Sequence, residues 1–176
     1  MTAPGTRLHD DVRVGEALPE LPIALTRTLI VAGAIASRDY QDVHHDPELA
    51  RQRGSEDIFM NILTTNGLVG RYVTDWTGPS GVVEQVAIRL GAPNYPGDTM
   101  VLSGAVSEVG DPAGRDDGRA TVTLSVRGAN SRGDHVTGTV RVALPRRGSD
   151  LRPLPDGPFP DSADAVASAP RPMRRR

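Results

Sequence analysis

The chain has 176 residues, a formal net charge of −2 and no cysteine. This length suits one domain with a sizeable core, and the weak net charge gives no support for nucleic-acid binding. Without cysteine the chain forms no disulfide, catalytic thiolate or zinc–sulfur site. The sequence shows no signal peptide and no apolar run long enough to span a membrane, so we expect a cytoplasmic protein that binds neither nucleic acid nor membrane.

Composition along the chain predicts three parts. Residues 1–17 are polar and interrupted by proline and glycine, which predicts a flexible N-terminal arm. Residues 18–145 carry the apolar patterns of one folded domain. Residues 146–176 are rich in proline and arginine and lack periodicity, which predicts a disordered tail.

The first half of the domain combines one strand pattern with two short helix patterns. Leu21–Val31 is apolar and β-branched enough for a strand, and residues 32–38 can form a short helix after it. Asp46 and Pro47 are typical of a helix start, because aspartate caps free amides and proline is tolerated at the first helical position. We expect this second helix to end at Gly54.

The longest helical pattern lies between Gly54 and Trp76, with Ser55 as the expected N-cap and Gly78-Pro79 as the stop. Four segments rich in valine and threonine follow it, with turn residues between them: 82–90, 99–109, 119–127 and 134–144. Consecutive strands with short connections predict an antiparallel meander. With the long helix lying across it, the fold class is α+β.

An acid and an imidazole, Asp39 and His44, stand five residues apart before the long helix. On a helix they would point apart, since five residues rotate a side chain by roughly 140° beyond a full turn. The segment is polar and ends at Asp46-Pro47, which predicts a loop in which the two groups can converge. From the residues alone, a loop carboxylate and a surface imidazole are the competing interpretation.

Two other histidine arrangements are less informative. The run His44, His45 and Asp46 matches no metal-binding spacing, so we expect no metal site. His135 begins a strand after a Gly-Asp turn, and the sequence shows no partner for it.

The loop sequence resembles the active-site segment of the MaoC-like (R)-specific enoyl-CoA hydratases. The resemblance covers roughly residues 18–144 and places Asp39 and His44 at the family's catalytic positions. Further matches are Ala50 and two later segments, Arg89-Leu90-Gly91-Ala92-Pro93 and Pro96-Gly97-Asp98-Thr99. Within the family, the chain is similar to the small subunits of actinobacterial steroid side-chain (cholesterol) enoyl-CoA hydratases. The resemblance implies a hotdog fold, in which an antiparallel sheet wraps one long central helix.

The chain departs from the wider family at four positions. Arg38, Gln41 and Asp42 stand where the family pattern has glycine, asparagine and proline, and Asn61 stands near a family glycine at the start of the long helix. Three of these residues lie in the catalytic loop. The changes are shared with the steroid hydratase subunits, so they favour the specific resemblance over the general one.

The resemblance implies hydration of a steroid side-chain 2-enoyl-CoA. Asp39 and His44 would activate the water and relay its proton, Gln41 would bind the water, and a main-chain amide near Asn61 would stabilise the thioester oxygen. Which of the acid–base pair is the base stays open. The alternatives are a non-catalytic acyl-CoA-binding or structural subunit and, less favoured, a hotdog thioesterase, which usually carries its carboxylate on the long helix.

The resemblance also implies a partner and no cofactor. A single hotdog unit pairs with another, so we expect a larger MaoC-like hydratase subunit in a heterodimer or heterotetramer. Coenzyme A is part of the acyl-CoA substrate, so no separate cofactor is expected.

Overall fold

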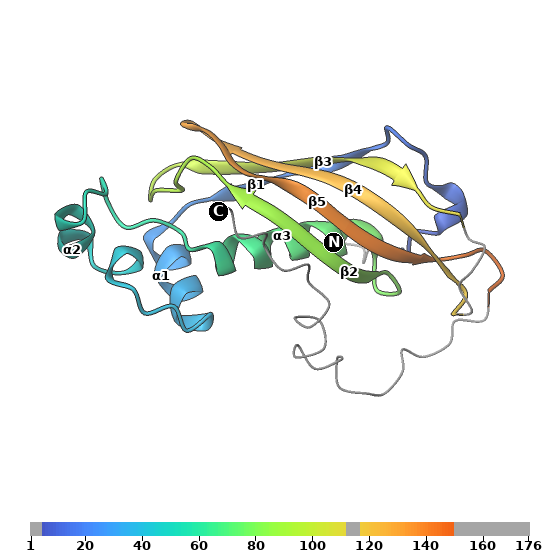
Figure 1. Cartoon of the computed structure of the whole chain (residues 1–176), viewed down its shortest axis with the longest axis horizontal. Coiled ribbons are helices and arrows are strands. Elements are labelled where there is room, and N and C mark those ends of the chain that lie inside the picture. Colours follow the sequence, from blue (N-terminus) through green and yellow to red (C-terminus); the bar gives the residue numbers. More distant parts are fainter. Residues whose placement is uncertain (1–4, 112–116, 150–176) are drawn as a thin grey trace, which may run out of the picture.

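The computed structural model describes residues 5–111 and 117–149. A five-stranded antiparallel sheet has the strand order β1–β3–β4–β5–β2. One long helix, α3 (Ile62–Thr77), lies along the sheet, and two shorter helices gather at one end (Figure 1). The other elements are η1 (His9–Asp11), β1 (Ala17–Ala24), α1 (Arg27–Ala36), η2 (Asp42–His44), α2 (Pro47–Gln52), β2 (Val82–Leu90), β3 (Thr99–Val109), β4 (Arg119–Asn130) and β5 (Gly133–Pro145).

The core lies between α3 and the sheet. One face of α3 is buried, and its residues recur at the spacing of three and four expected for a helix packed on one side: Thr65, Val69, Tyr72, Val73, Trp76 and Thr77. Alternate residues of the central strands meet this face, including Leu102, Leu124 and Val140, each fully buried. The predicted α+β hotdog arrangement is confirmed.

The positions of four strands and two helix boundaries agree with the sequence patterns. The observed strands match the predicted segments to within a few residues at their ends. Asp46 accepts hydrogen bonds from the amides of Glu48 and Leu49, as expected for an N-cap. Gly78 ends α3 with a positive φ of 72°, a conformation that glycine adopts without strain.

The predicted strand at Leu21–Val31 is wrong in its second half. The strand β1 ends at Ala24, and α1 begins at Arg27 because the Thr26 hydroxyl accepts a hydrogen bond from the Leu29 amide. The β-branched residues of this segment favour a strand locally. Burial of Ile30 and Ala34 on one helical face overrides that preference.

The predicted start of the long helix and the predicted meander are also wrong. The helix α3 begins at Ile62 rather than after Ser55, because the amides of Phe59 and Met60 donate to Val43 and Asn94 carbonyls elsewhere in the chain. In the sheet, β3, β4 and β5 form a meander, but β2 pairs with β5 at the far edge. The connection from β2 to β3 therefore crosses the end of the sheet.

Part of the predicted arm and tail is described. The Arg7 amide donates to the Thr77 carbonyl, Val12 is buried, and the Gly15 amide donates to Val106. The Arg147 guanidinium donates to Asp11. The domain boundaries stay predictions, and the predicted tail from residue 150 lies outside the described residues. Among the helices of the described part, none is long and apolar enough to cross a membrane.

Candidate functional site

The segment between α1 and α2 is the loop that the sequence predicts. It turns away from α1 at Arg38, whose φ of 57° is left-handed, and the Asp39 amide then donates to the Ala34 carbonyl. The short 3₁₀ turn η2 carries His44 at its end and buries it. The two turns bend the chain back on itself, so that residues five apart face each other.

Asp39 and His44 converge, as predicted. The Oδ2 atom of Asp39 lies 3.3 Å from Nε2 of His44. Only 15% of the Asp39 side chain and 6% of the His44 side chain are exposed. The pair is therefore largely shielded from water, which strengthens the electrostatic interaction between the two groups.

The Asp39 carboxylate is held by two side-chain amides. Asn61 Nδ2 donates to Oδ2 at 3.0 Å, and Gln41 Nε2 donates to Oδ1 at 3.2 Å. The Asn61 hydrogen bond is the largest influence and lowers the pKa of Asp39, with smaller contributions from Gln41 and, when the ring of His44 is protonated, from its charge. Asp39 is thereby kept as an ionised carboxylate that accepts hydrogen bonds.

His44 is oriented by Phe59. Its Nδ1 lies 2.7 Å from the Phe59 carbonyl oxygen, and its ring packs edge-on against the Phe59 ring with centroids 5.0 Å apart. A carbonyl oxygen only accepts hydrogen bonds, so Nδ1 carries a proton. In the neutral ring, Nε2 then has a free lone pair directed toward Asp39.

Asn61 connects the pair to the start of α3. It is 2% exposed, and its Oδ1 caps the helix by accepting from the Thr64 amide at 2.9 Å. The same side chain donates through Nδ2 to Asp39 and to Ser37 Oγ. Backbone amides at a helix start attract negative charge, and here they lie next to the acid–base pair.

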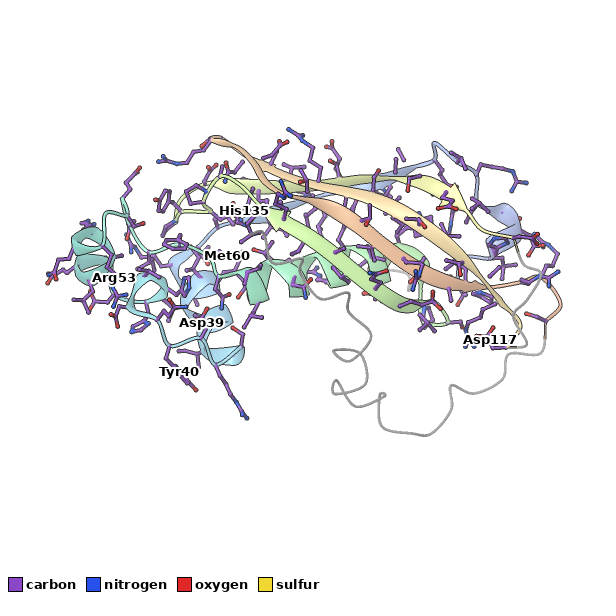
Figure 2. All side chains as sticks on the ribbon, viewed as in Figure 1. Asp39, Tyr40, Arg53, Met60, Asp117 and His135 are labelled. Atoms are coloured by element: carbon purple, nitrogen blue, oxygen red, sulfur yellow. The ribbon has the colours of Figure 1, made fainter. Side chains whose placement is uncertain are left out.

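A pocket of about 340 Å³ opens beside these groups. Figure 2 shows Asp39, Met60 and His135 at one end of the sheet, near the start of α3, and Asp117 at the other. The pocket brings together all four predicted site residues and a wall from the β2–β3 connection. Its lining is Asp39, Gln41, Val43, His44, Phe59, Met60, Asn61, Ile62, Leu90, Gly91, Ala92, Pro93 and His135.

Comparison with known proteins identifies the family. The model of the MaoC-like domain family matches residues 12–128. The beta subunit of the 3-oxo-4,17-pregnadiene-20-carboxyl-CoA hydratase of Mycobacterium tuberculosis is 49% identical over 131 residues, which are 74% of this chain and 95% of that protein. The chain belongs to the MaoC-like family.

Solved structures of known proteins share the fold. A chain of the ChsH1–ChsH2 complex from Mycobacterium tuberculosis is 49% identical, with a TM-score of 0.69 over 75% of this chain and 98% of that one. The (R)-hydratase PhaJ1 from Pseudomonas aeruginosa, at 19% identity, has a TM-score of 0.69 over 85% of this chain and 96% of that one. At that identity the second likeness concerns the fold alone.

Sequence reasoning missed His135 as part of this pocket. It is 2% exposed, lines the pocket and hydrogen-bonds through both ring nitrogens. Its partners, Ala92 and Thr65, are distant in sequence, and only the Gly91–Pro93 resemblance pointed to this wall. Across the described ranges, no cluster of three or more histidine and carboxylate side chains is arranged to hold a metal ion.

Proposed function

We propose that this chain is the catalytic subunit of an enoyl-CoA hydratase, a hydro-lyase that adds water across the 2,3 double bond of a steroid side-chain 2-enoyl-CoA. The observation that carries the proposal is the 3.3 Å contact between Asp39 Oδ2 and His44 Nε2 in a pocket that also contains the start of α3. The steroid substrate class is supported by the 49% identity to a steroid-CoA hydratase beta subunit.

In the proposed reaction, one water donates a hydrogen bond to each member of the pair. Asp39 is ionised and its pKa is lowered, so it orients the water and stabilises positive charge on the imidazole. His44 donates its Nδ1 proton to the Phe59 carbonyl in a hydrogen bond and leaves Nε2 free, so Nε2 accepts the water proton as hydroxide attacks Cβ. The same proton then passes to Cα, which leaves the pair in its starting state.

The start of α3 supplies the third requirement of the proposed reaction. Negative charge develops on the thioester oxygen as Cβ is attacked, and backbone amides at a helix N-terminus stabilise such charge. Asn61 and Ile62 line the pocket at this position. We assign the oxyanion contact to their main-chain amides. In this proposal the Gln41 carboxamide, which donates to Asp39, also binds the water.

The proposed enzyme works with a larger MaoC-like hydratase subunit in a heterodimer or heterotetramer. Four apolar side chains with large exposed fractions belong to α1, the catalytic loop and the start of α3: Ile35 (57%), Tyr40 (67%), Ile62 (49%) and Leu63 (50%). A partner that covers these side chains would bury apolar area and close the pocket over a bulky acyl group. The reaction uses no cofactor beyond the coenzyme A of its substrate, and we expect it in the cytoplasm.

A thioesterase is less well supported than a hydratase. Hotdog thioesterases usually place a catalytic carboxylate on the long helix. Glu56 and Asp57 lie before α3, and Asp75, near its C-terminal end, is 59% exposed and paired with Arg71. Asp39 and His44, by contrast, share a pocket at the other end of that helix.

The test is hydration of a steroid side-chain 2-enoyl-CoA by the full chain, with and without the large subunit. The reaction is monitored as the loss of the enoyl thioester absorbance. Asp39→Asn, which keeps the size of the side chain, and His44→Asn, which replaces the imidazole by a smaller polar group, should lower kcat by about 10²-fold or more each. Their melting temperatures report whether they fold. Hydration that survives the double substitution would place the active site in the partner and leave this chain an acyl-CoA-binding or structural subunit.

A further inference from the structure

The second histidine of the pocket, His135, has no free ring nitrogen. It is the third residue of β5 and lines the pocket next to the Gly91–Pro93 wall, to which it is hydrogen-bonded. Its Nδ1 lies 2.7 Å from the Ala92 carbonyl oxygen, and its Nε2 lies 2.9 Å from Thr65 Oγ1. This contrasts with His44, whose Nε2 faces an ionised carboxylate.

These two contacts determine where the protons of His135 and Thr65 lie. The Ala92 carbonyl only accepts, so Nδ1 carries the ring proton. Burial lowers the pKa of His135 and favours the neutral ring, in which Nε2 is an acceptor. The Thr65 hydroxyl therefore donates to Nε2. A neutral ring with both nitrogens engaged does not exchange protons with a substrate, so its contribution is positional.

Thr65 carries this link to the first turn of α3. It is fully buried one turn after Asn61, and both its amide and its hydroxyl lie 3.2 Å from the Asn61 carbonyl oxygen. One hydroxyl proton cannot serve two acceptors at full strength, so the donation to His135 leaves the amide to hold that carbonyl. The Asn61 side chain in turn holds Asp39.

On its other side, His135 is tied to the wall of the pocket by its backbone. The Gly91 amide donates to the His135 carbonyl and the Ala92 amide donates to the Asp134 carbonyl, both at 2.8 Å. The side-chain bond to Ala92 closes the same loop. One imidazole therefore connects the Gly91–Pro93 wall to the first turn of α3, in addition to the backbone hydrogen bond from the Met60 amide to the Asn94 carbonyl nearby.

We propose that His135 and Thr65 are positioning residues that fix the gap between the Gly91–Pro93 wall and the first turn of α3. This inference rests on the proposed hydratase function. A thioester held against the wall reaches the Asn61 and Ile62 amides only when that gap is correct. The gap affects the transition state, in which the oxygen becomes charged, more than it affects substrate binding. Loss of the link should lower kcat and leave KM nearly unchanged.

The link is tested in the full chain, together with its hydratase partner, by four variants. Thr65→Val keeps the shape and removes the hydroxyl, and Thr65→Ser keeps the hydroxyl as the control. His135→Asn retains a donor for Ala92 and cannot reach Thr65. We expect Thr65→Val and His135→Asn each to lower kcat roughly tenfold, within the loss that a displacement of an ångström or less produces. The Thr65→Val/His135→Asn double variant should be no slower than either single variant, because each single substitution already removes the same hydrogen bond between Thr65 and His135.

If the wild-type chain with its partner hydrates the substrate, the kcat values of these variants test the proposal. Wild-type kcat in Thr65→Val, or single effects that multiply in the double variant, would overturn it. So would a Thr65→Ser variant as slow as Thr65→Val, because the hydroxyl would then not be the group that matters. If His135→Asn fails to fold, the two Thr65 variants carry the comparison alone.

A nitrogen NMR spectrum of histidine-labelled chain at pH 7 separates this inference from the proposed function. We expect His135 as the neutral tautomer with its proton on Nδ1, and we expect its Nε2 resonance to shift in Thr65→Val. A proton on Nε2, or an unchanged Nε2 resonance, would overturn the link even in an active enzyme. Absence of hydration by wild-type protein with this tautomer present would instead refute the hydratase assignment.

Discussion

Asn61 makes three side-chain hydrogen bonds, and different substitutions remove different subsets of them. Its Oδ1 caps the Thr64 amide, and its Nδ2 donates to Asp39 and to Ser37. Asn61→Ala removes all three. Asn61→Ser keeps an oxygen close enough to cap the helix and is too short to reach Asp39. Asn61→Asp keeps the size and the cap and places a second carboxylate against Asp39.

Each lost contact has a typical magnitude. An N-cap contributes about 1 kcal/mol, a hydrogen bond to an ionised carboxylate about 1.5–3 kcal/mol, and the neutral bond to Ser37 about 1 kcal/mol. The three terms share one side chain and do not simply add. We expect Asn61→Ala to lower the free energy of unfolding by about 3–4 kcal/mol, and Asn61→Ser by about 1 kcal/mol less because it retains the cap.

The pH dependence has a definite sign. The Asn61 amide is the main cause of the lowered pKa of Asp39, so the folded value lies below the unfolded value of about 3.9. The stability that this gives is present above the unfolded value and is lost as pH falls through the folded value. Asn61→Ala should raise the folded pKa and shrink this effect. Asn61→Asp should raise it further, and should gain stability on acidification as one carboxyl takes a proton.

Urea unfolding followed by the fluorescence of the single, buried Trp76 measures the stabilities between pH 3 and 8. Carbon NMR of the carboxyl groups measures the pKa of Asp39, and the hydration assay measures kcat. Full activity in Asn61→Ser, or an unshifted Asp39 pKa in Asn61→Asp, would refute the argument that the Asn61 amide holds the carboxylate.

Two further predictions concern the backbone around the site. Gly33→Ala places a Cβ 2.3 Å from Thr64 Oγ1 and pushes α1 from α3, so it should lower the free energy of unfolding by about 1–3 kcal/mol. The new Cβ of Gly67→Ala meets nothing within 4 Å, so this variant should stabilise α3 by about 0.5–1 kcal/mol. Equal urea midpoints for the two variants would contradict the close packing. Arg38 has a left-handed backbone conformation that costs roughly 1–2 kcal/mol for a residue other than glycine. Arg38→Gly removes this strain, so we expect the free energy of unfolding to rise by up to about 1 kcal/mol in the same assay. A loss of stability would show that the Arg38 side chain holds the turn.

The predictable parts of the fold depend on local chemistry. Alternation of apolar residues placed the strands, Asp46-Pro47 placed α2, and Gly78 ended α3. The errors arise where distant partners decide. Ser55 precedes acidic residues and looks like a helix cap, but its hydroxyl bonds to Asp57 and Tyr95 instead. The order of the strands in the sheet is equally non-local.

The candidate site likewise has features that the local sequence predicts and features that depend on distant residues. Loop chemistry predicted that Asp39 and His44 can converge, because five residues of polar loop can turn back on themselves, and the resemblance to the MaoC-like family favoured their pairing. The position of Asn61 beside Asp39 did not follow, since 22 residues and α2 separate them. Gln41, two residues from Asp39, was assigned to the water, and its hydrogen bond to the carboxylate emerged only from the structure.

The two pocket histidines differ in their partners, which residue type cannot reveal. Each donates from Nδ1 to a carbonyl at 2.7 Å, to Phe59 for His44 and to Ala92 for His135. The other nitrogen meets an ionised carboxylate in one case and a neutral hydroxyl in the other. A carboxylate stabilises the imidazolium that forms when Nε2 takes a proton, and a hydroxyl in a buried wall does not. The same side chain therefore suits proton transfer at residue 44 and a fixed structural link at residue 135.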